Sequence, residues 1–161
     1  MSTERNKQLV DHFDAVLNTR DLGQLDELCM PDMINHTLAP GRPSGLAGTR
    51  EFLSTAGRAW QTDRWREKVV VAEGDFVVQY GVREGTWPGG PFRGFDLPAG
   101  DYTRDFAVMY RLVDGRIAER WAVRDDLGMM VQLGGLQPNA GTNAPPAGTQ
   151  PSTRGALISE S

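Results

Sequence analysis

Two arginines and two aspartates stand between a strand-like and a helix-like segment, in the stretch RWAVRDD that begins at Arg120. A carboxylate can remove an acidic proton from carbon, and arginine can stabilise the resulting enolate or hold a substrate carboxylate. We assign Asp126 to the N-cap of a helix starting at Leu127, since an aspartate there accepts otherwise unpaired backbone amides. We assign Asp125 to the chemistry, with a salt bridge to a nearby arginine as its alternative role. Arg120 and Arg124 could contact the substrate, and a solvated strand face is their alternative.

His36, in the stretch INHT, is the second acid/base candidate. Its imidazole titrates near neutral pH and could therefore shuttle a proton, although it could equally hydrogen-bond a loop backbone. Asn35 could donate to a substrate carbonyl, or simply stabilise a turn. His12 lies among polar residues and is interpreted as a surface side chain.

A further group of residues could provide aromatic walls. Flat aromatic side chains suit a polycyclic ligand because they bury a large area in a defined orientation, although ordinary core packing would use the same residues. The candidates are Trp60, Tyr80, Trp87 and Tyr110. The glycines between residues 85 and 100 are not followed by Gly-Lys-Ser/Thr, so they do not predict nucleotide binding.

Composition excludes several classes of function. The formal net charge is −4, which gives no broad basic surface for nucleic acid. No run of about 20 apolar residues predicts a membrane span, and the first residues lack a signal-peptide core, so a cytoplasmic protein is expected. With Cys29 as the single cysteine and only two histidines, neither an intrachain disulfide nor a Cys/His metal site is predicted, and Cys29 is expected to be a buried structural thiol. We predict no cofactor.

Helices are predicted to come first in the chain. Apolar residues from Leu9 to Leu17 recur at helical spacing, a shorter pattern from Leu22 runs toward Pro31, and residues 49–61 form a third amphipathic pattern. Proline should end the second helix.

Antiparallel strands are predicted to follow the helices. Residues 68–82 favour two strands joined at Gly74, and residues 101–124 favour a hairpin turning at Asp114-Gly115. The Gly- and Pro-rich segment 85–100 is expected to be a long crossing or gating loop. The result is an α+β domain over residues 1–136, with a short C-terminal helix and a mobile Pro/Gly/Thr-rich tail over residues 137–161.

Strand alternation divides the last strand into two faces. Ile117, Trp121 and Val123 share one face and are predicted to be core, whereas Arg120, Ala122 and Arg124 share the other.

Several motifs together resemble the SnoaL-like polyketide cyclases over roughly residues 5–135. These are FDAVLNTRDLGQLDEL, PDMINHTLAPG, VVVAEGDFVVQYGVREGTWPGGPFRG and YRLVDGRIAERWAVRDDLGMMVQLG. The resemblance implies the cone-shaped fold shared with ketosteroid isomerase and limonene epoxide hydrolase, a curved antiparallel sheet of about four strands with helices around a deep pocket. It also implies a homo-oligomer, a dimer or tetramer, and intramolecular aldol ring closure of a hydrophobic or aromatic substrate without metal or cofactor.

The sequence departs from the family pattern at the catalytic positions. The family aspartate one residue after Trp121 falls on Ala122, and its partner histidine falls on Val108, while Trp87 replaces a histidine that is frequent in the family. Alanine cannot transfer a proton, so the base is either lost or relocated; a one-residue bulge could bring Asp125 to that position. The substrate is predicted to contact Val108, Trp121 and Ala122.

Three functions stay open on the sequence alone. The first is a cyclase using Asp125 or His36. The second is a cofactor-independent hydroxylase or related tailoring enzyme, which would suit the missing carboxylate. The third is a protein that binds a small molecule without converting it.

Overall fold

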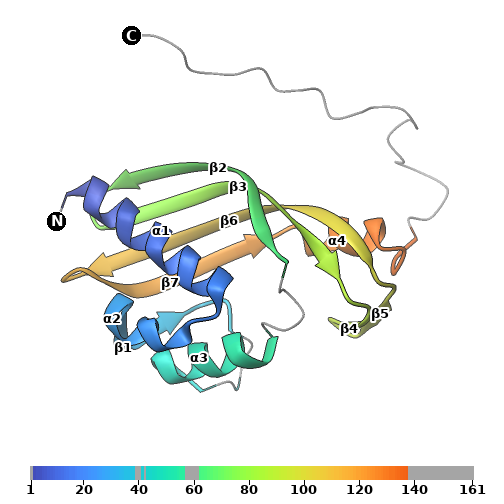
Figure 1. The fold of residues 1–161 in the computed structure, drawn as a ribbon, viewed down its shortest axis with the longest axis horizontal. Coiled ribbons are helices and arrows are strands. Elements are labelled where there is room, and N and C mark those ends of the chain that lie inside the picture. The colour runs from blue at the N-terminus through green and yellow to red at the C-terminus, as the bar shows by residue number, and fades with distance from the viewer. Residues whose placement is uncertain (1, 39–40, 42, 57–61, 138–161) are drawn as a thin grey trace, which may run out of the picture.

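The computed structural model describes residues 2–38, 41, 43–56 and 62–137 (Figure 1). A long helix crosses one face of a curved sheet, and a short helix lies at the far end of that sheet beside a small hairpin. The helical elements are α1 (Thr3–Thr19), the 3-10 turn η1 (Leu22–Gln24), α2 (Leu25–Leu28), α3 (Gly45–Ala56) and α4 (Asp126–Gln132). The strands are β1 (Cys29–Asn35), β2 (Arg64–Glu73), β3 (Phe76–Trp87), β4 (Gly90–Phe92), β5 (Phe95–Leu97), β6 (Gly100–Val113) and β7 (Arg116–Arg124).

The α+β class is confirmed, but the main sheet has five strands in the order β1-β7-β6-β3-β2 rather than about four. The added strand is β1, which pairs in parallel with β7. The sequence predicted the end of a helix near Pro31 and no strand in this segment. Pro31 does not break it because β1 is an edge strand, where a missing amide proton costs no ladder hydrogen bond on the open side. Burial alternates from Met33 to Asn35, with Cys29, Met33 and Asn35 buried, whereas Pro31 and Asp32 are both exposed.

Both predicted hairpins are confirmed. β2 and β3 turn at Gly74, and β6 and β7 turn at Asp114-Gly115, where both residues have positive φ, 47° and 78°. Two consecutive positive φ angles match the right-handed twist of the strands, which explains the Asp-Gly pair.

The long loop predicted over residues 85–100 is wrong. β3 continues to Trp87, β6 starts at Gly100, and β4 and β5 form a small hairpin between them. Glycines that argued against a strand occupy the bends instead; Gly89 and Gly94 have φ of 87° and 86°. Apolar side chains of this hairpin pack against α4 in a second hydrophobic cluster that includes Trp87, Leu97 and Met129.

A bulge in β7 changes the predicted face of one residue. Arg111 pairs with Glu119 but Leu112 pairs with Ile117, so Ala118 is the extra residue. Ile117 is therefore buried on the same side as Arg120, while Trp121 and Val123 are on the other side of the sheet. The prediction that these three residues share a core face is wrong, and Val123 is 72% exposed.

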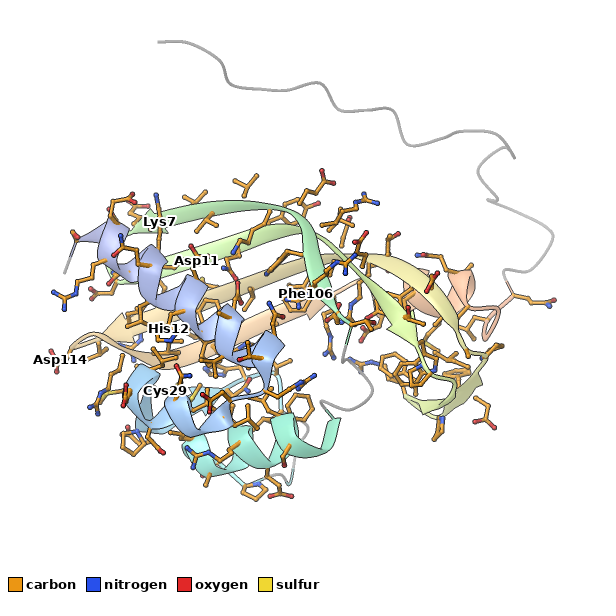
Figure 2. The ribbon with its side chains drawn as sticks, viewed as in Figure 1. Lys7, Asp11, His12, Cys29, Phe106 and Asp114 are labelled. Atoms are coloured by element: carbon orange, nitrogen blue, oxygen red, sulfur yellow. The ribbon has the colours of Figure 1, made fainter. Side chains whose placement is uncertain are left out.

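The main core lies between α1 and the face of the sheet that it covers, which we call the concave face (Figure 1). Val10, Phe13 and Val16 of α1 are buried there against β3 and β6. Phe106, which is labelled in Figure 2, belongs to this face as well. The opposite, uncovered side is called the convex face.

Candidate active site on the concave face

A row of four side chains crosses the middle of the concave face. Val70 of β2 pairs with Gln79 of β3, Gln79 with Val108 of β6, and Val108 with Ala122 of β7. The row contains Val108 and Ala122, the positions at which the predicted histidine and aspartate are missing. Its single polar member is Gln79, which is fully buried.

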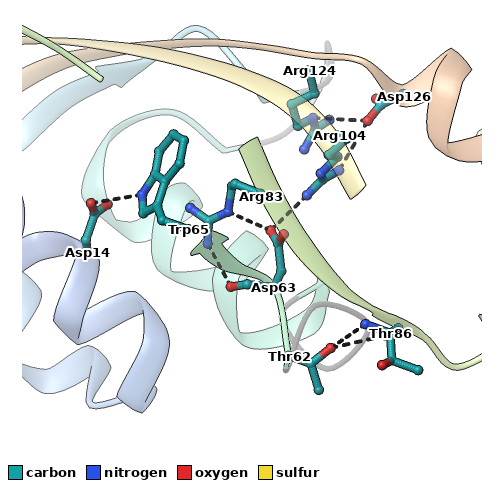
Figure 3. Close-up of polar contacts among 9 residues, drawn as sticks. All are labelled: Asp14, Thr62, Asp63, Trp65, Arg83, Thr86, Arg104, Arg124 and Asp126. Atoms are coloured by element: carbon teal, nitrogen blue, oxygen red, sulfur yellow. Dashed lines mark hydrogen bonds and ion pairs between the residues drawn. The ribbon is translucent and has the colours of Figure 1, made fainter. Parts of the chain in front are cut away.

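Asp14 reaches this row from α1. Its Oδ2 atom accepts hydrogen bonds from Gln79 Nε2 at 2.8 Å, Trp65 Nε1 at 3.2 Å and Lys68 Nζ at 3.3 Å. The residue is only 7% exposed, and Figure 3 shows its carboxylate directed at the Trp65 indole. Among the described residues no donor bonds the other oxygen, Oδ1. A buried carboxylate with one anchored and one available oxygen can accept a proton from a bound ligand.

Lys68 provides the positive charge that balances this carboxylate. Its Nζ also lies 2.7 Å from Asp11 Oδ1 on the exposed side of α1. Burial lowers the pKa of Lys68, but the hydrogen bonds and negative charges of Asp11 and Asp14 outweigh burial and raise it overall. Lys68 therefore stays charged at neutral pH.

A chain of charged side chains continues from the indole toward α4 (Figure 3). The Arg83 guanidinium stacks over Trp65 at 4.9 Å and pairs with Asp63 at 3.2 Å. Asp63 also pairs with Arg104 at 2.8 Å, and Arg104 reaches Asp126 at 3.3 Å. With a side chain only 2% exposed, Arg104 needs both carboxylates to offset the loss of its hydration.

Arg120 and Arg124 extend this positively charged surface along β7. Arg120 donates to Thr37 Oγ1 at 3.0 Å and lies 6.0 Å from the Tyr110 ring. Tyr110 is buried against Phe13, and burial raises the pKa of its hydroxyl, so it remains a proton donor at neutral pH. The site thus combines a carboxylate, a protonated phenol and two arginines on one face.

The structure reverses the predicted roles of the two aspartates at the junction. Asp125 is the N-cap of α4, since its Oδ1 accepts from the Gly128 amide at 2.8 Å, and its side chain is exposed. Asp126, predicted as the cap, is instead buried in the first turn and paired with Arg93, Arg104 and Arg124. The helix starts one residue earlier than expected, which shifts the cap by one residue.

His36 lies on the convex side. Its ring stacks on Trp121 with 4.6 Å between centroids, and its Nε2 is 2.9 Å from Glu119 Oε2. Glu119 also binds Arg111, and the hydrogen bonds from His36 and then Arg111 lower the pKa of its carboxyl. The structure therefore does not bring His36 together with Arg120 or Ala122, which face the other side.

Asn35 forms a local turn in addition to a buried contact. Its Oδ1 accepts from the Thr37 amide at 3.1 Å, as an Asx turn does, and its Nδ2 contacts Thr49 Oγ1 at 3.4 Å. Both polar atoms of the Asn35 side chain therefore have partners within the protein, and no ligand is needed to explain their position.

The predicted aromatic walls are not brought together. Tyr80 is exposed on the convex face, Trp87 packs on Phe92 in the second cluster, and Tyr110 lies in the main core. Trp60 lies outside the described residues. Trp65 and Phe106 lie on the concave face with Tyr110, and the Trp65 and Phe106 rings are in edge contact at 5.4 Å.

Sequence reasoning missed Asp14, although a signal was available. Asp14 falls within the apolar stripe of the first helix, four residues after Val10 and three before Leu17. A carboxylate on the buried side of an amphipathic helix requires a partner, and this pattern could have identified it. Gln79, in contrast, stands inside the strand pattern FVVQYGV and gave no comparable sign.

Cys29 and His12 lie where the sequence predicted them. Cys29 is buried, and burial raises the pKa of its thiol to about 12, as expected of a structural cysteine. His12 is exposed on α1 and contacts Gln24 (Figure 2). Within the described ranges, no three His, Cys, Asp or Glu side chains are arranged to hold a metal ion. None of the helices in the described part of the chain has the length and apolar character to span a bilayer.

The helices packed on a curved, mostly antiparallel sheet define an α+β protein of the cone-shaped type. The sequence profile of the SnoaL-like polyketide cyclases matches residues 7–133, and the chain therefore belongs to this family. Comparison with the curated protein sequences gave no match.

Solved structures support the same fold. TsrD from Streptomyces laurentii superposes with a TM-score of 0.70 at 25% identity, covering 84% of this chain and 99% of that one. IdmH from Streptomyces antibioticus, a proposed polyketide cyclase, gives 0.65 at 26% identity, covering 80% and 98%. AclR from Streptomyces galilaeus, a proposed hydroxylase, gives 0.65 at 22% identity, covering 84% and 100%.

Proposed function

We propose that this protein catalyses the cofactor-independent ring closure of a polyketide-type or other carbonyl substrate on its concave face, with Asp14 as general base. The observation that carries this proposal is the hydrogen bond of 2.8 Å between Asp14 and Gln79. This contact places a buried carboxylate beside the row that contains Val108 and Ala122. The base absent from β7 would thus be supplied from α1.

Each concave group has a role in an aldol closure. Asp14 Oδ1 removes a proton from the carbon next to a substrate carbonyl, and the electron pair of that C–H bond moves into the enolate. The Tyr110 hydroxyl donates a hydrogen bond to the enolate oxygen and stabilises it. The enolate carbon then attacks a second carbonyl of the same molecule, and the proton held by Asp14 returns to the new alkoxide, so that Asp14 is regenerated.

The roles predicted for Asp125 and His36 have less support. The Asp125 carboxylate caps α4, and His36 stacks on the convex face. We therefore favour Asp14 as the base.

The test is the exchange of a carbon-bound proton in heavy water. An aromatic ketone such as 2-tetralone takes up deuterium next to its carbonyl when a base removes that proton, and NMR follows the uptake. Asp14→Asn keeps the shape of the side chain, and we expect it to lower the enzyme-catalysed rate by about 10²–10⁴-fold.

Asp11→Asn is the matched control, because Asp11 lies on the same helix and binds the same Lys68 from its exposed side. It should leave the exchange rate unchanged. Equal rates in wild type and Asp14→Asn, with both folded, would remove Asp14 from the mechanism.

A tailoring reaction such as hydroxylation is the second candidate, favoured by the apolar side chains at Val108 and Ala122. It would leave Asp14 as a ligand-positioning group. In that case an aromatic polyketide would be converted to a product of altered mass, whereas aldol addition keeps the mass. Recovery of the ligand unchanged, with no deuterium uptake, would indicate a binding protein.

We also propose that two copies of the chain associate through the convex face. Two neighbouring rows on this side are largely apolar: Val69, Tyr80, Ala107 and Val123, and Val71, Val78, Met109 and Trp121. Val69 and Val123 are 63% and 72% exposed. Apolar surface spread over four strands is unusual for a monomer, and a stable pair would bury about 800 Å² on each partner.

Sedimentation of wild type and of Val69→Asp with Val123→Asp tests this association. The charged variant should sediment as a monomer at concentrations where the wild type does not. A monomeric wild type would refute the interface.

A further inference from the structure

The arginines around Arg120 and Arg124 on the concave face outnumber the carboxylates that pair with them. Asp63 pairs with Arg83 and Arg104, and Asp126 pairs with Arg93, Arg104 and Arg124. Among the described residues no carboxylate lies within ion-pair distance of Arg120. The undescribed residues before position 138 contain no Asp or Glu. Four guanidinium groups therefore share two carboxylates, and Arg120 pairs with neither.

Arg120 is the least compensated of the five. Its partners are neutral, the Thr37 hydroxyl at 3.0 Å and the Tyr110 side chain. Its Nε is buried without a hydrogen-bond acceptor in the described structure. A buried guanidinium donor without an acceptor is costly, and an anion bound beside it would remove that cost.

Arg124 is held only loosely by its own carboxylate. The contact from its Nε to Asp126 Oδ1 is 3.5 Å, and Arg93 and Arg104 bind the same aspartate at 2.6 and 3.3 Å. Burial lowers the pKa of Arg124; Asp126 opposes this shift, and Arg104, Arg93 and Arg120 add to it. The positive charges are thus close enough to repel one another.

Ala122 separates these two arginines along β7. The three residues alternate onto the concave side of β7, where successive side chains on one face lie about 6.6 Å apart. Ala122 is partly buried in the main core cluster and carries only a methyl group. A planar anionic group above this methyl could meet a guanidinium on each side.

We propose that Arg120 and Arg124 form a carboxylate-binding subsite over Ala122, so that the substrate is a free carboxylic acid rather than an ester or another neutral carbonyl compound. This inference deepens the function proposed above and rests on the same concave face. An alanine between two arginines cannot transfer a proton itself, whereas the two guanidinium groups beside it can bind an anion. Arginine is suited to this role because it remains charged and binds carboxylates through two parallel donors.

Calorimetric titration with a matched acid and ester tests the subsite. Anthraquinone-2-carboxylate and its methyl ester share one flat ring system and differ in charge. Wild type should bind the acid at least about 10-fold more tightly, since a charged hydrogen bond contributes more than a neutral one. Arg120→Gln and Arg124→Gln should each remove most of this preference while affinity for the ester stays within about threefold.

Arg116→Gln is the matched control. Arg116 begins the same strand but is exposed and outside the cluster, and its variant should keep the preference for the acid. Equal affinity of wild type for acid and ester, failure to bind the acid, or an unchanged preference in Arg120→Gln would overturn the proposal.

The two proposals can fail separately. Asp14→Asn should retain the preference for the acid, because Asp14 lies on α1 and not in the subsite. A retained preference in wild type without ketone exchange would refute the general-base role and leave the anion subsite standing. Ketone exchange without a preference for the acid would refute the subsite alone.

Discussion

The two faces of one sheet differ in a way that composition does not indicate. On the concave face the central row contains the buried Gln79, whose amide nitrogen donates to the buried Asp14, while Gln79 Oε1 and Arg120 Nε are buried without a hydrogen-bond partner in the described structure. On the convex face the adjacent row begins with Val69 and ends with Val123, and both valines are mostly exposed. Apolar side chains usually lie in the interior and polar ones at the surface. The concave face departs from this pattern because it buries polar groups, and the convex face departs from it because it exposes valines.

Each departure points to a molecule outside the described chain. A buried Asp14 and an undercompensated Arg120 fit a polar ligand on the concave side, and exposed valines fit a second copy on the convex side. A ligand site on one face and an interface on the other, as proposed above, would produce this contrast.

The largest expected effect is the removal of a buried charge from the concave face. Arg104→Met leaves Asp63 and Asp126 without their shared partner, and we expect the free energy of unfolding to fall by about 3–5 kcal/mol. Arg93→Met is the control, because Arg93 binds the same Asp126 but is 56% exposed, and its loss should cost less than about 1 kcal/mol. Urea unfolding measures both, and equal losses would contradict the distinction between the buried and exposed arginines.

The same Val→Ala substitution on each face compares how much a valine there contributes to stability. Val77 is fully buried on the concave side, and Val77→Ala should lower the free energy of unfolding by about 1.5–3 kcal/mol. Val69→Ala on the convex side should change the stability of the monomer by less than about 0.5 kcal/mol. Unfolding at concentrations that favour the monomer checks both values; a large loss for Val69→Ala there would mean that the chain itself covers the convex face.

Two substitutions of Asp125 distinguish a helix-capping role from a catalytic role. Asp125→Ala should cost about 1 kcal/mol of stability because the Gly128 amide loses its acceptor, and Asp125→Asn only a few tenths because asparagine also caps helices. Thermal unfolding and deuterium exchange are measured on the same samples. If Asp125→Asn were stable but inactive in exchange, Asp125 would replace Asp14 as the proposed base.

The smallest effect concerns pH and the convex face. The pKa of Glu119 is lowered by the hydrogen bond from His36 and then by Arg111, so the carboxylate form is favoured in the folded protein. Its contribution to stability is present above the unfolded-state pKa of about 4.3 and is lost as pH falls through the lower folded-state pKa. The stability difference between wild type and Glu119→Gln should therefore shrink on acidification, and should shrink less in a His36→Ala background. A difference independent of pH would argue against this coupling.

Local patterns in the sequence determined much of the fold. The apolar spacing from Leu9 to Leu17 gave α1, the Asp114-Gly115 pair gave the β6–β7 turn, and the motifs over most of the chain gave the family. The helix and the turn follow from signals that act over a few residues, the helical period and the φ angles that a turn requires.

The site depended on contacts between distant segments. Alternation put Arg120, Ala122 and Arg124 on one face, but which face is enclosed was decided by the packing of α1, and the bulge at Ala118 moved Ile117 to that face. Asp14 meets Gln79 across 65 residues of sequence, and no local pattern encodes that contact.

The junction that first suggested chemistry shows the same division. The residue types in RWAVRDD were sufficient to predict a strand, a cap and an arginine-bearing face. The Asp125 amide donates to the Asp105 carbonyl at 3.0 Å, and this contact fixes the end of β7 against β6. Asp125 is therefore the residue that caps the helix. Asp126 was thereby turned inward to the arginines, because a helix that begins one residue earlier rotates every side chain of its first turn by about 100°.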